Sequence, residues 1–192
     1  MPRPADPARH AAILTVARKL FHERQYASTT MADIAAAAGM GVGSLYVYFP
    51  TKEAIALTLV ERYFAELREA IVPPLRDLVG AAAISESLAA GFLAAERNMD
   101  VVALCRLVLP KHFPPECQRL LEAVEQAMAH QMRQGAFRAL DPTFVTHWVN
   151  AQVEWVITRC FVERAGGIEE YQRQVTELIV RAIVRPPEST GA

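Results

Sequence analysis

The sequence has little of what builds covalent or metal frameworks. It contains 3 cysteines, widely spaced, and no CxxC pair or Cys/His cluster at ligand spacing, so reduced thiols are favoured over disulfides or metal sites. Cys117, beside a predicted helix start, is a weak candidate for a redox thiol. No apolar run is long enough to span a bilayer and no signal-peptide core is present. We expect a cytoplasmic protein with no membrane segment, no metal and no cofactor.

Patterns that build sheets are also missing. No stretch alternates strictly between apolar and polar residues with hairpin turns at its ends. Only 9 glycines occur, and the long runs are rich in Ala, Leu, Glu, Arg and Gln, which favour helices. The composition therefore predicts an all-α fold. A hydrophobic fraction of 52% is slightly high, which leaves some apolar surface for a partner or a ligand.

Neither sign of charge predominates over the whole chain, but the charges are unevenly distributed along it. The net charge is −1, whereas residues 1–53 contain six basic and four acidic side chains and sum to +2, so the remainder sums to −3. A basic end on an acidic body suits a protein that binds DNA through one end. Residues 1–5, including Arg3, are predicted to form a flexible arm.

The first fifty residues predict three short helices. Asp6-Pro7 is an N-cap followed by proline at the first helical position, and Thr30 with Asp33 forms a variant of the capping box. Gly39 is expected to end the second helix in the left-handed conformation. A third helix, over residues 42–48, follows this glycine-containing turn. Two short helices joined in this way form a helix-turn-helix, whose second helix can enter a DNA major groove.

The third of these helices has an unusual outward surface. Leu45 and Phe49 are expected to point inward, which leaves small residues at one end and two tyrosines at the other. Small residues let the backbone approach base edges, and tyrosine hydroxyls can bond phosphates; alternatively, Tyr46 and Tyr48 only cover the core. Lys52 and the N-terminus of the next helix form a candidate phosphate site, although a solvated surface lysine is the ordinary alternative.

A longer motif runs through this region. It comprises Thr29-Thr30, Asp33-Ile34-Ala35, Ala38-Gly39 and Leu45-Tyr46-x-Tyr48-Phe49-x-x-Lys52-Glu53. At these spacings the sequence resembles the TetR family of bacterial transcriptional regulators over roughly residues 8–60. The resemblance implies binding to a palindromic double-stranded DNA operator. It also implies contacts to phosphate from Thr30, Tyr46, Tyr48 and Lys52, and positions nearest the base edges for Val42, Gly43 and Ser44.

The sequence departs from the family pattern at two positions of the third helix. Basic residues often occur near its start and after the Leu-Tyr pair, and here those positions hold Val42 and Val47. Direct readout of guanine by arginine from this helix is therefore not expected. Val42 is placed to touch a thymine methyl group instead.

The rest of the chain predicts six further helices, at residues 51–72, 75–98, 99–109, 116–133, 143–164 and 168–184. Pro73-Pro74 is expected to end the first of them, and Gly80 and Gly91 to bend or loosen the second. We therefore expect two domains: a helix-turn-helix DNA-binding domain at residues 1–52 and a helical ligand-binding and dimerisation domain at residues 53–192.

The predicted second domain has candidate residues for two tasks. Polar side chains among apolar helices suggest a pocket, and its apolar lining suggests a hydrophobic or amphipathic molecule, although Arg106 is more readily explained by its stem reaching water. Its candidates are Phe92, Glu96, Arg106, Phe113, Asn150 and Glu154. The last two helices have surplus apolar surface, which predicts a four-helix bundle with a second copy rather than purely internal packing. The candidates for this homodimer interface are Phe144, Trp148, Trp155, Tyr171, Val175 and Leu178.

These features predict a transcriptional regulator, and foremost a repressor that a small molecule releases from its operator. A ligand-dependent activator would have the same sequence features. A helical enzyme is disfavoured, because the sequence has no nucleophile elbow, phosphate loop or paired metal ligands. A dimerising scaffold would leave the glycine turn, the two tyrosines and Lys52 unexplained.

Overall fold

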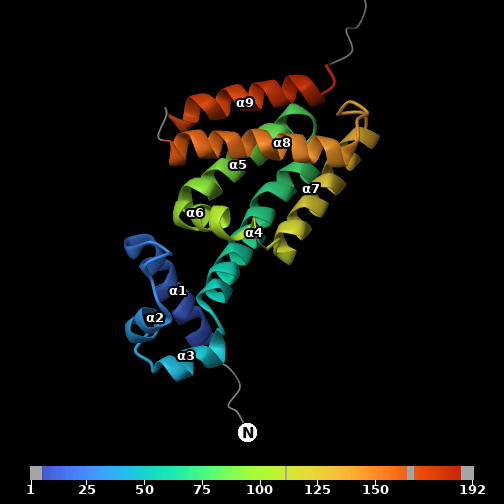
Figure 1. The fold of residues 1–192 in the computed structure, drawn as a ribbon. Helices are drawn as coiled ribbons and strands as arrows, with labels where there is room; N and C mark the ends of the chain where they lie inside the picture. The colour runs from blue at the N-terminus through green and yellow to red at the C-terminus, as the bar shows by residue number, and fades with distance from the viewer. Residues whose placement is uncertain (1–5, 111, 164–166, 187–192) are drawn as a thin grey trace, which may run out of the picture. The chain divides into compact units, whose positions relative to one another are not determined.

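The protein is helical throughout the part of the chain that the structure describes, residues 6–110, 112–163 and 167–186 of the computed structural model. These ranges contain nine α-helices and one π-helical turn and no named strand, which confirms the predicted all-α fold (Figure 1). The arm predicted at residues 1–5 and the last residue of the helix predicted at 143–164 lie outside the described residues.

The chain divides into two compact units. Unit 1 comprises residues 1–63 and 98–116, and unit 2 comprises residues 64–97 and 117–192. Helix α4, Lys52–Asp77, belongs to unit 1 up to Tyr63 and to unit 2 from Phe64. The division predicted between residues 52 and 53 runs through unit 1, and it stays a prediction about where the functional domains meet.

Unit 1 is built from four helices and the first part of α4. They are α1 (Pro7–Arg24), α2 (Met31–Ala37), α3 (Val42–Tyr48) and α6 (Met99–Val108). Asp6 caps α1 as predicted, since its carboxylate accepts a hydrogen bond of 3.0 Å from the amide of Ala8. The interior is apolar, and Ile13, Leu14, Ile34 and Leu45 are almost fully buried. Helices α1, α2 and α3 therefore all contribute to the core of unit 1.

Helix α6 is fastened to α1 inside unit 1 by a forked ion pair. The guanidinium of Arg18 donates to the two carboxylate oxygens of Asp100 at 2.5 and 2.7 Å, and to the side-chain oxygen of Asn98 at 3.1 Å. Burial alone would raise the pKa of Asp100, but the hydrogen bonds and charge of Arg18, with backbone amides, lower the pKa overall. A bidentate pair of this kind holds two helices in one orientation.

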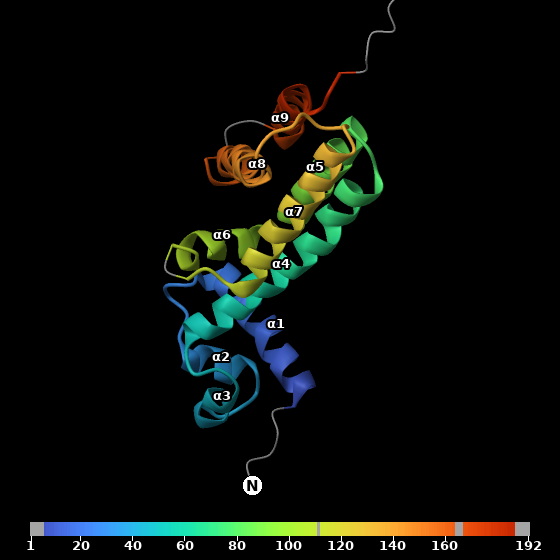
Figure 2. The ribbon, with the colours of Figure 1, turned by 90° about the vertical axis from the view of Figure 1, so that its right-hand side faces the viewer.

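Unit 2 consists of the rest of α4 with α5 (Ala81–Arg97), α7 (Pro115–Arg133, its first two residues in unit 1), α8 (Pro142–Ile157) and α9 (Ile168–Ile183). A π-helical turn, Thr158–Val162, continues α8. Helices α8 and α9 lie side by side, as both ribbon views show (Figure 2). The apolar core of this unit draws on every one of its helices; its largest fully buried members include Phe92, Phe137, Met128 and Ile179.

The prediction that Pro73-Pro74 ends the fourth helix is wrong. Helix α4 continues through both prolines to Asp77. Proline removes a backbone donor, so Pro73 and Pro74 leave the carbonyls four residues before them, those of Glu69 and Ala70, without their helical partners. Near this stretch, the hydroxyl of Ser87, buried on α5, donates to the carbonyl of Ile71 at 2.9 Å. This tertiary hydrogen bond joins α5 to the part of α4 that precedes the prolines.

The end of α4 is held by a fully buried glutamine. The side-chain amide of Gln131, on α7, donates to the carbonyls of Leu75 and Leu78 at 2.9 and 2.6 Å. Its carbonyl accepts from the amide of Gly80 at 3.3 Å. Gln131 thus satisfies the carbonyls of a helix end and the turn that follows it, as a buried polar side chain must.

The helix predicted from residue 75 begins later. Gly80 adopts a positive φ of 63°, which turns the chain, and α5 starts at Ala81. Gly91 does not loosen this helix: a Cβ at Gly91 would lie 3.4 Å from a methyl group of Ile71, so the missing side chain permits close packing of α5 on α4.

The cysteines are packed as thiols. Cys105 and Cys117 are buried, and Cys160 is partly buried. Burial raises the pKa of the Cys117 thiol to about 11, so it stays protonated at neutral pH. This argues against the redox role considered for Cys117.

Candidate nucleic-acid interface

The turn between α2 and α3 is fixed by local hydrogen bonds. The hydroxyl of Thr30 accepts from the amide of Asp33 at 3.1 Å, and the carboxylate of Asp33 accepts from the amide of Thr30 at 2.8 Å. This is the predicted capping box, and the hydrogen bonds from Thr30 lower the pKa of Asp33. Gly39 then adopts a φ of 65°, as expected for the left-handed end of α2. A rigid turn therefore sets the direction of α3.

Helix α3 is anchored by one side and exposed on the other. Leu45 and Phe49 are buried, as predicted, and they leave the opposite side of the helix uncovered. The candidate base-reading positions Val42, Gly43 and Ser44 are all exposed. A face that is held rigidly from behind and open in front is what a helix needs in order to enter a groove.

The two tyrosines differ in their surroundings. Tyr46 is exposed, whereas Tyr48 is half-buried. Tyr46 is therefore not explained as a cover for the core, and Tyr48 remains compatible with both of its interpretations. Thr30 is exposed, although its hydroxyl already donates to Asp33 at 2.5 Å, so a phosphate would have to share this group with the capping box.

Lys52 has partners that the sequence did not reveal. Its ammonium group donates to the carbonyls of Tyr26 and Thr29 at 2.6 and 2.7 Å and approaches that of Ala27 at 3.4 Å. It also lies 4.4 Å from the centre of the Tyr26 ring. The side chain is half-buried, so Lys52 clamps the loop between α1 and α2, and its positive charge stays beside the start of α4.

A second residue of this loop was missed by sequence reasoning. Thr29, next to the candidate Thr30, is almost fully buried, and its hydroxyl donates to the carbonyl of Gln25 at 3.0 Å. Gln25 itself has a positive φ of 65°, and it is the non-glycine residue with this conformation in the described part of the chain. Paired threonines and an aromatic residue nearby were visible in the sequence, but their partners become evident only in three dimensions.

The six candidates for a ligand pocket do not share one environment. Arg106 and Phe113 belong to unit 1 and are exposed. In unit 2, Phe92 is buried in the core, and Glu96 is exposed on the same helix. Asn150 and Glu154 lie one turn apart on the exposed side of α8. The pocket therefore stays a prediction, and Phe92 is packed within the apolar core of unit 2.

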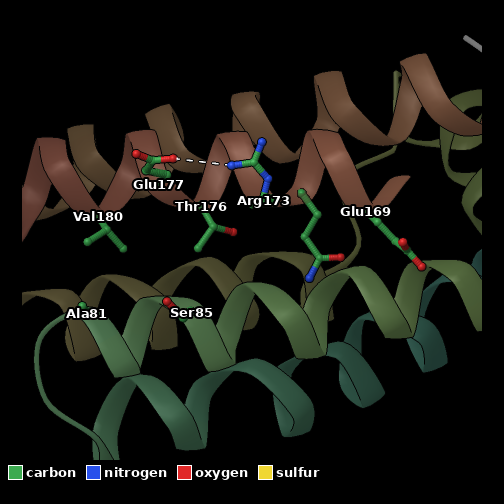
Figure 3. A pocket seen from close by; sticks show the side chains of 8 residues that line it. Ala81, Ser85, Glu169, Arg173, Thr176, Glu177 and Val180 are labelled. Atoms are coloured by element: carbon green, nitrogen blue, oxygen red, sulfur yellow. Dashed lines mark ion pairs between the residues drawn. The ribbon is translucent and has the colours of Figure 1, made fainter. Parts of the chain in front are cut away.

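Unit 2 has an open groove elsewhere, between α5 and α9. It has a volume of about 520 Å³ and includes Ser85 from α5 and Thr176 from α9 (Figure 3). An ion pair of 3.9 Å between Arg173 and Glu177 crosses its rim. None of the six pocket candidates lines this groove. Its open shape would leave much of a bound small molecule exposed to water, unlike the enclosed sites typical of such ligands.

The dimer candidates fall into an exposed and a buried set. Phe144 and Leu178 have 65% and 64% of their surface exposed, and Trp155, also exposed, packs edge-on against half-buried Tyr171 at 5.6 Å. Trp148 is half-buried, and Val175 is buried within the chain itself. We use the name α8–α9 face for the exposed residues Phe144, Trp155 and Leu178 together with Tyr171, which packs against Trp155.

The described residues contain neither a cluster of metal ligands nor a membrane-spanning helix. No group of three His, Cys, Asp or Glu side chains there could hold a metal ion. None of the helices in the described part of the chain combines the length and apolar character needed to cross a bilayer.

The capped α2, the glycine turn and the half-exposed α3 define a helix-turn-helix of the DNA-binding class. Residues 13–59 match the family model for bacterial regulatory proteins of the tetR family, which confirms the resemblance for this segment. The HTH-type transcriptional regulator EthR of Mycobacterium tuberculosis (strain ATCC 25618 / H37Rv) is 42% identical over 60 residues. That match covers 31% of this chain and 28% of EthR.

Other likenesses extend over the whole chain at lower identity. The HTH-type transcriptional repressor KstR2 of Rhodococcus jostii is 27% identical over 206 residues, covering 96% of this chain and 98% of the repressor. The solved structure of a SmeT–triclosan complex has a TM-score of 0.71 at 19% identity and covers 96% of this chain and 98% of its own. The family match is thus confined to residues 13–59, the solved structure shares the fold of nearly the whole chain, and the two relatives are named as a transcriptional regulator and a transcriptional repressor.

Proposed function

We propose that this protein is a DNA-binding transcriptional regulator that acts as a repressor and leaves its operator when a small molecule binds. The observation that carries the DNA-binding part is α3, which is held by Leu45 and Phe49 and exposes Val42, Gly43, Ser44 and Tyr46. A helix of this kind next to a rigid turn is built to enter a major groove.

The proposed contacts divide by chemistry. Val42, Gly43 and Ser44 approach base edges, because small side chains let the backbone come near. The hydroxyls of Thr30, Tyr46 and Tyr48 bond phosphates. Lys52 acts partly through the loop that it clamps and partly through its charge, which remains beside the N-terminus of the 26-residue helix α4.

DNA binding is tested by titrating labelled duplexes at several salt concentrations. The duplexes are the DNA upstream of the protein's own gene and a pool of random sequence from which bound molecules are selected. We expect an enriched palindromic sequence whose affinity falls linearly with salt on logarithmic axes. Absence of an enriched sequence, or binding that does not respond to salt, would refute the regulator proposal.

We propose that two copies bind together through the α8–α9 face. This face exposes Phe144, Trp155 and Leu178, and large apolar patches on soluble proteins commonly mark partner surfaces. A second copy is the fitting occupant because two heads reading a palindrome gain affinity that one head lacks. Light scattering of wild type should give twice the mass of the chain, and Leu178→Asp should give the monomer; a wild-type monomer would contradict the proposal.

The ligand part of the proposal is supported by relatives. One relative is named a repressor, and one neighbour in fold has been solved as a complex with triclosan, an apolar molecule. Binding would shift the population toward a separation of the two heads that no longer fits adjacent major grooves. A thermal-shift screen of hydrophobic metabolites and drugs, followed by operator titration with each hit, tests this. Hits that tighten DNA binding would indicate the alternative, a ligand-dependent activator.

A further inference from the structure

The outward face of α3 has a centre, and it is Val47. At 100° per residue, Leu45 marks the buried side of α3, and Gly43 and Val47 lie opposite to it, one turn apart. Val47 is 69% exposed, the highest value among the exposed large hydrophobic side chains. An isopropyl group held away from its own core at the middle of a reading face has no structural task within the chain.

No contact within the chain explains why the neighbouring position on this face, Gly43, is a glycine. Gly43 has no positive φ, and a Cβ at this position would meet nothing within 4 Å. Glycine inside a helix costs roughly 0.5–1 kcal/mol relative to alanine, so the fold itself would be better served by alanine. The gap at Gly43 fits a surface that must approach the backbone of α3 closely from outside the chain.

The same helix has no charge. Residues 42–48 contain no Lys, Arg, His, Asp or Glu, and the nearby ammonium of Lys52 is engaged by loop carbonyls. Hydrogen bonds from a cation to guanine are therefore not available along this face. The major-groove feature that a branched apolar side chain can recognise is the C5 methyl group of thymine.

We propose that Val47 is a specificity-determining residue that packs on a thymine methyl group in each operator half-site, while Gly43 lets the DNA come close enough for this contact. The proposal rests on the proposed DNA-binding function and refines it, because it names the base that the centre of α3 selects. Specificity at this position comes from apolar contact, and the operator requires thymine there.

The experiment uses the selected operator with deoxyuridine replacing one thymidine at a time, since uracil lacks only the methyl group. Affinities of wild type, Val47→Ala and the control Val79→Ala are measured by fluorescence anisotropy. Val79 is a matched control because it is 63% exposed and follows α4 in unit 2, so it is not part of the helix-turn-helix. Far-UV circular dichroism of all three proteins verifies that they are folded.

For wild type and Val79→Ala, replacing one particular thymidine of a half-site by deoxyuridine should lower the affinity about fourfold, which is the effect of losing the burial of one methyl group. Val47→Ala should bind the unmodified operator about as weakly as wild type binds the operator with deoxyuridine at that position. Replacing that thymidine should then cause no further loss of affinity for Val47→Ala. A selected operator without such a thymidine, or an equal loss in Val47→Ala, would overturn the inference and leave the regulator proposal standing. Failure to select any operator would instead refute the regulator proposal.

Discussion

The two units of this chain are held together in different ways. In unit 1, ion pairs join residues from different elements, Arg18 of α1 with Asp100 of α6 and Arg24 of α1 with Asp33 of α2. A hydrogen bond of 3.1 Å also joins Glu53 of α4 and the imidazole of His112. In unit 2, the pairs formed by Arg173 and Arg181 with Glu177 lie along a single helix. The long-range polar contacts there include the buried amide of Gln131 and the hydroxyl of Ser87.

This difference predicts different responses to solvent. Partly exposed ion pairs weaken with salt and with protonation, whereas buried amides and apolar packing do so much less. Unit 1, which contains the proposed DNA-binding surface, should therefore be the unit whose stability depends on pH. The two tryptophans, Trp148 and Trp155, both lie in α8 of unit 2, so tryptophan fluorescence reports on unit 2 while circular dichroism reports on both.

The largest effect is expected from the core of unit 2. Phe137 is completely buried in the connection between α7 and α8. Phe137→Ala should lower the free energy of unfolding seen by tryptophan fluorescence by about 3–5 kcal/mol, because it removes a large apolar side chain and leaves a cavity. Leu140→Ala, an exposed position in the same connection, is the control and should change it by less than about 1 kcal/mol. Equal effects would place Phe137 outside the core.

The next effect concerns the buried glutamine. Gln131→Leu should cost about 2–3 kcal/mol in urea unfolding, because the carbonyls of Leu75 and Leu78 lose their donor in a buried place. Gln126→Leu, at an exposed position of the same helix, is the matched control. A neutral Gln131→Leu would show that water replaces the amide and that the proline-containing end of α4 does not depend on it.

Lys52 is expected to matter for both folding and binding. Lys52→Met keeps the aliphatic stem but removes the donor to Tyr26 and Thr29, and should lower the stability of unit 1 by about 1–2 kcal/mol. It should also weaken binding to all duplexes alike. Lys19→Met, at an exposed lysine of α1, is the control for removal of charge. Hydrogen exchange of the loop at residues 25–30 measures the first effect; unchanged protection there would contradict the clamp.

The pair between Arg18 and Asp100 predicts a pH dependence. Because the folded pKa of Asp100 is lowered, the pair stabilises unit 1 above the ordinary pKa of aspartate, near 3.9, and this stability is lost as pH falls through the folded value. A double-mutant cycle with Asp100→Asn and Arg18→Met should give a coupling of about 1 kcal/mol at pH 7. The coupling should vanish in strong acid, and a coupling that persists there would exclude the carboxylate as its source.

The smallest expected effect is a gain in the stability of unit 1. Gln25 has φ 65° and ψ 148°, a region that only glycine occupies comfortably. Gln25→Gly should stabilise unit 1 by less than about 1 kcal/mol, since the relief of strain is partly offset by the greater freedom of glycine in the unfolded chain. Thermal unfolding followed by circular dichroism measures it. A loss of stability would show that the side chain of Gln25 contributes more than its backbone conformation costs.

The features that the sequence predicted well are local. Asp6 and Thr30 cap the helices that follow them, because an N-cap depends on atoms within three residues. Gly39 likewise has its predicted conformation. Elements whose ends are decided by neighbouring residues could therefore be placed from the sequence alone.

The features that were missed depend on residues far apart in the sequence. Helix α4 continues past Pro73 and Pro74 in a stretch that Ser87 and Gln131 contact from other helices, and no local pattern announces these partners. The clamp by Lys52 joins atoms more than twenty residues apart. The membership of α6 in unit 1 depends on Arg18 and Asp100, eighty-two positions apart. Sequence reasoning therefore located the exposed side of α3 but not the contacts that hold unit 1 together.

The most direct test of the account is hydrogen–deuterium exchange of the whole protein with and without its selected operator. We expect the largest gain in protection in residues 29–52, which contain α2, the turn and α3, and little change in α7 and the core of unit 2. Protection that is greatest in unit 2, or absent from α3, would contradict the assignment of DNA binding to this helix-turn-helix.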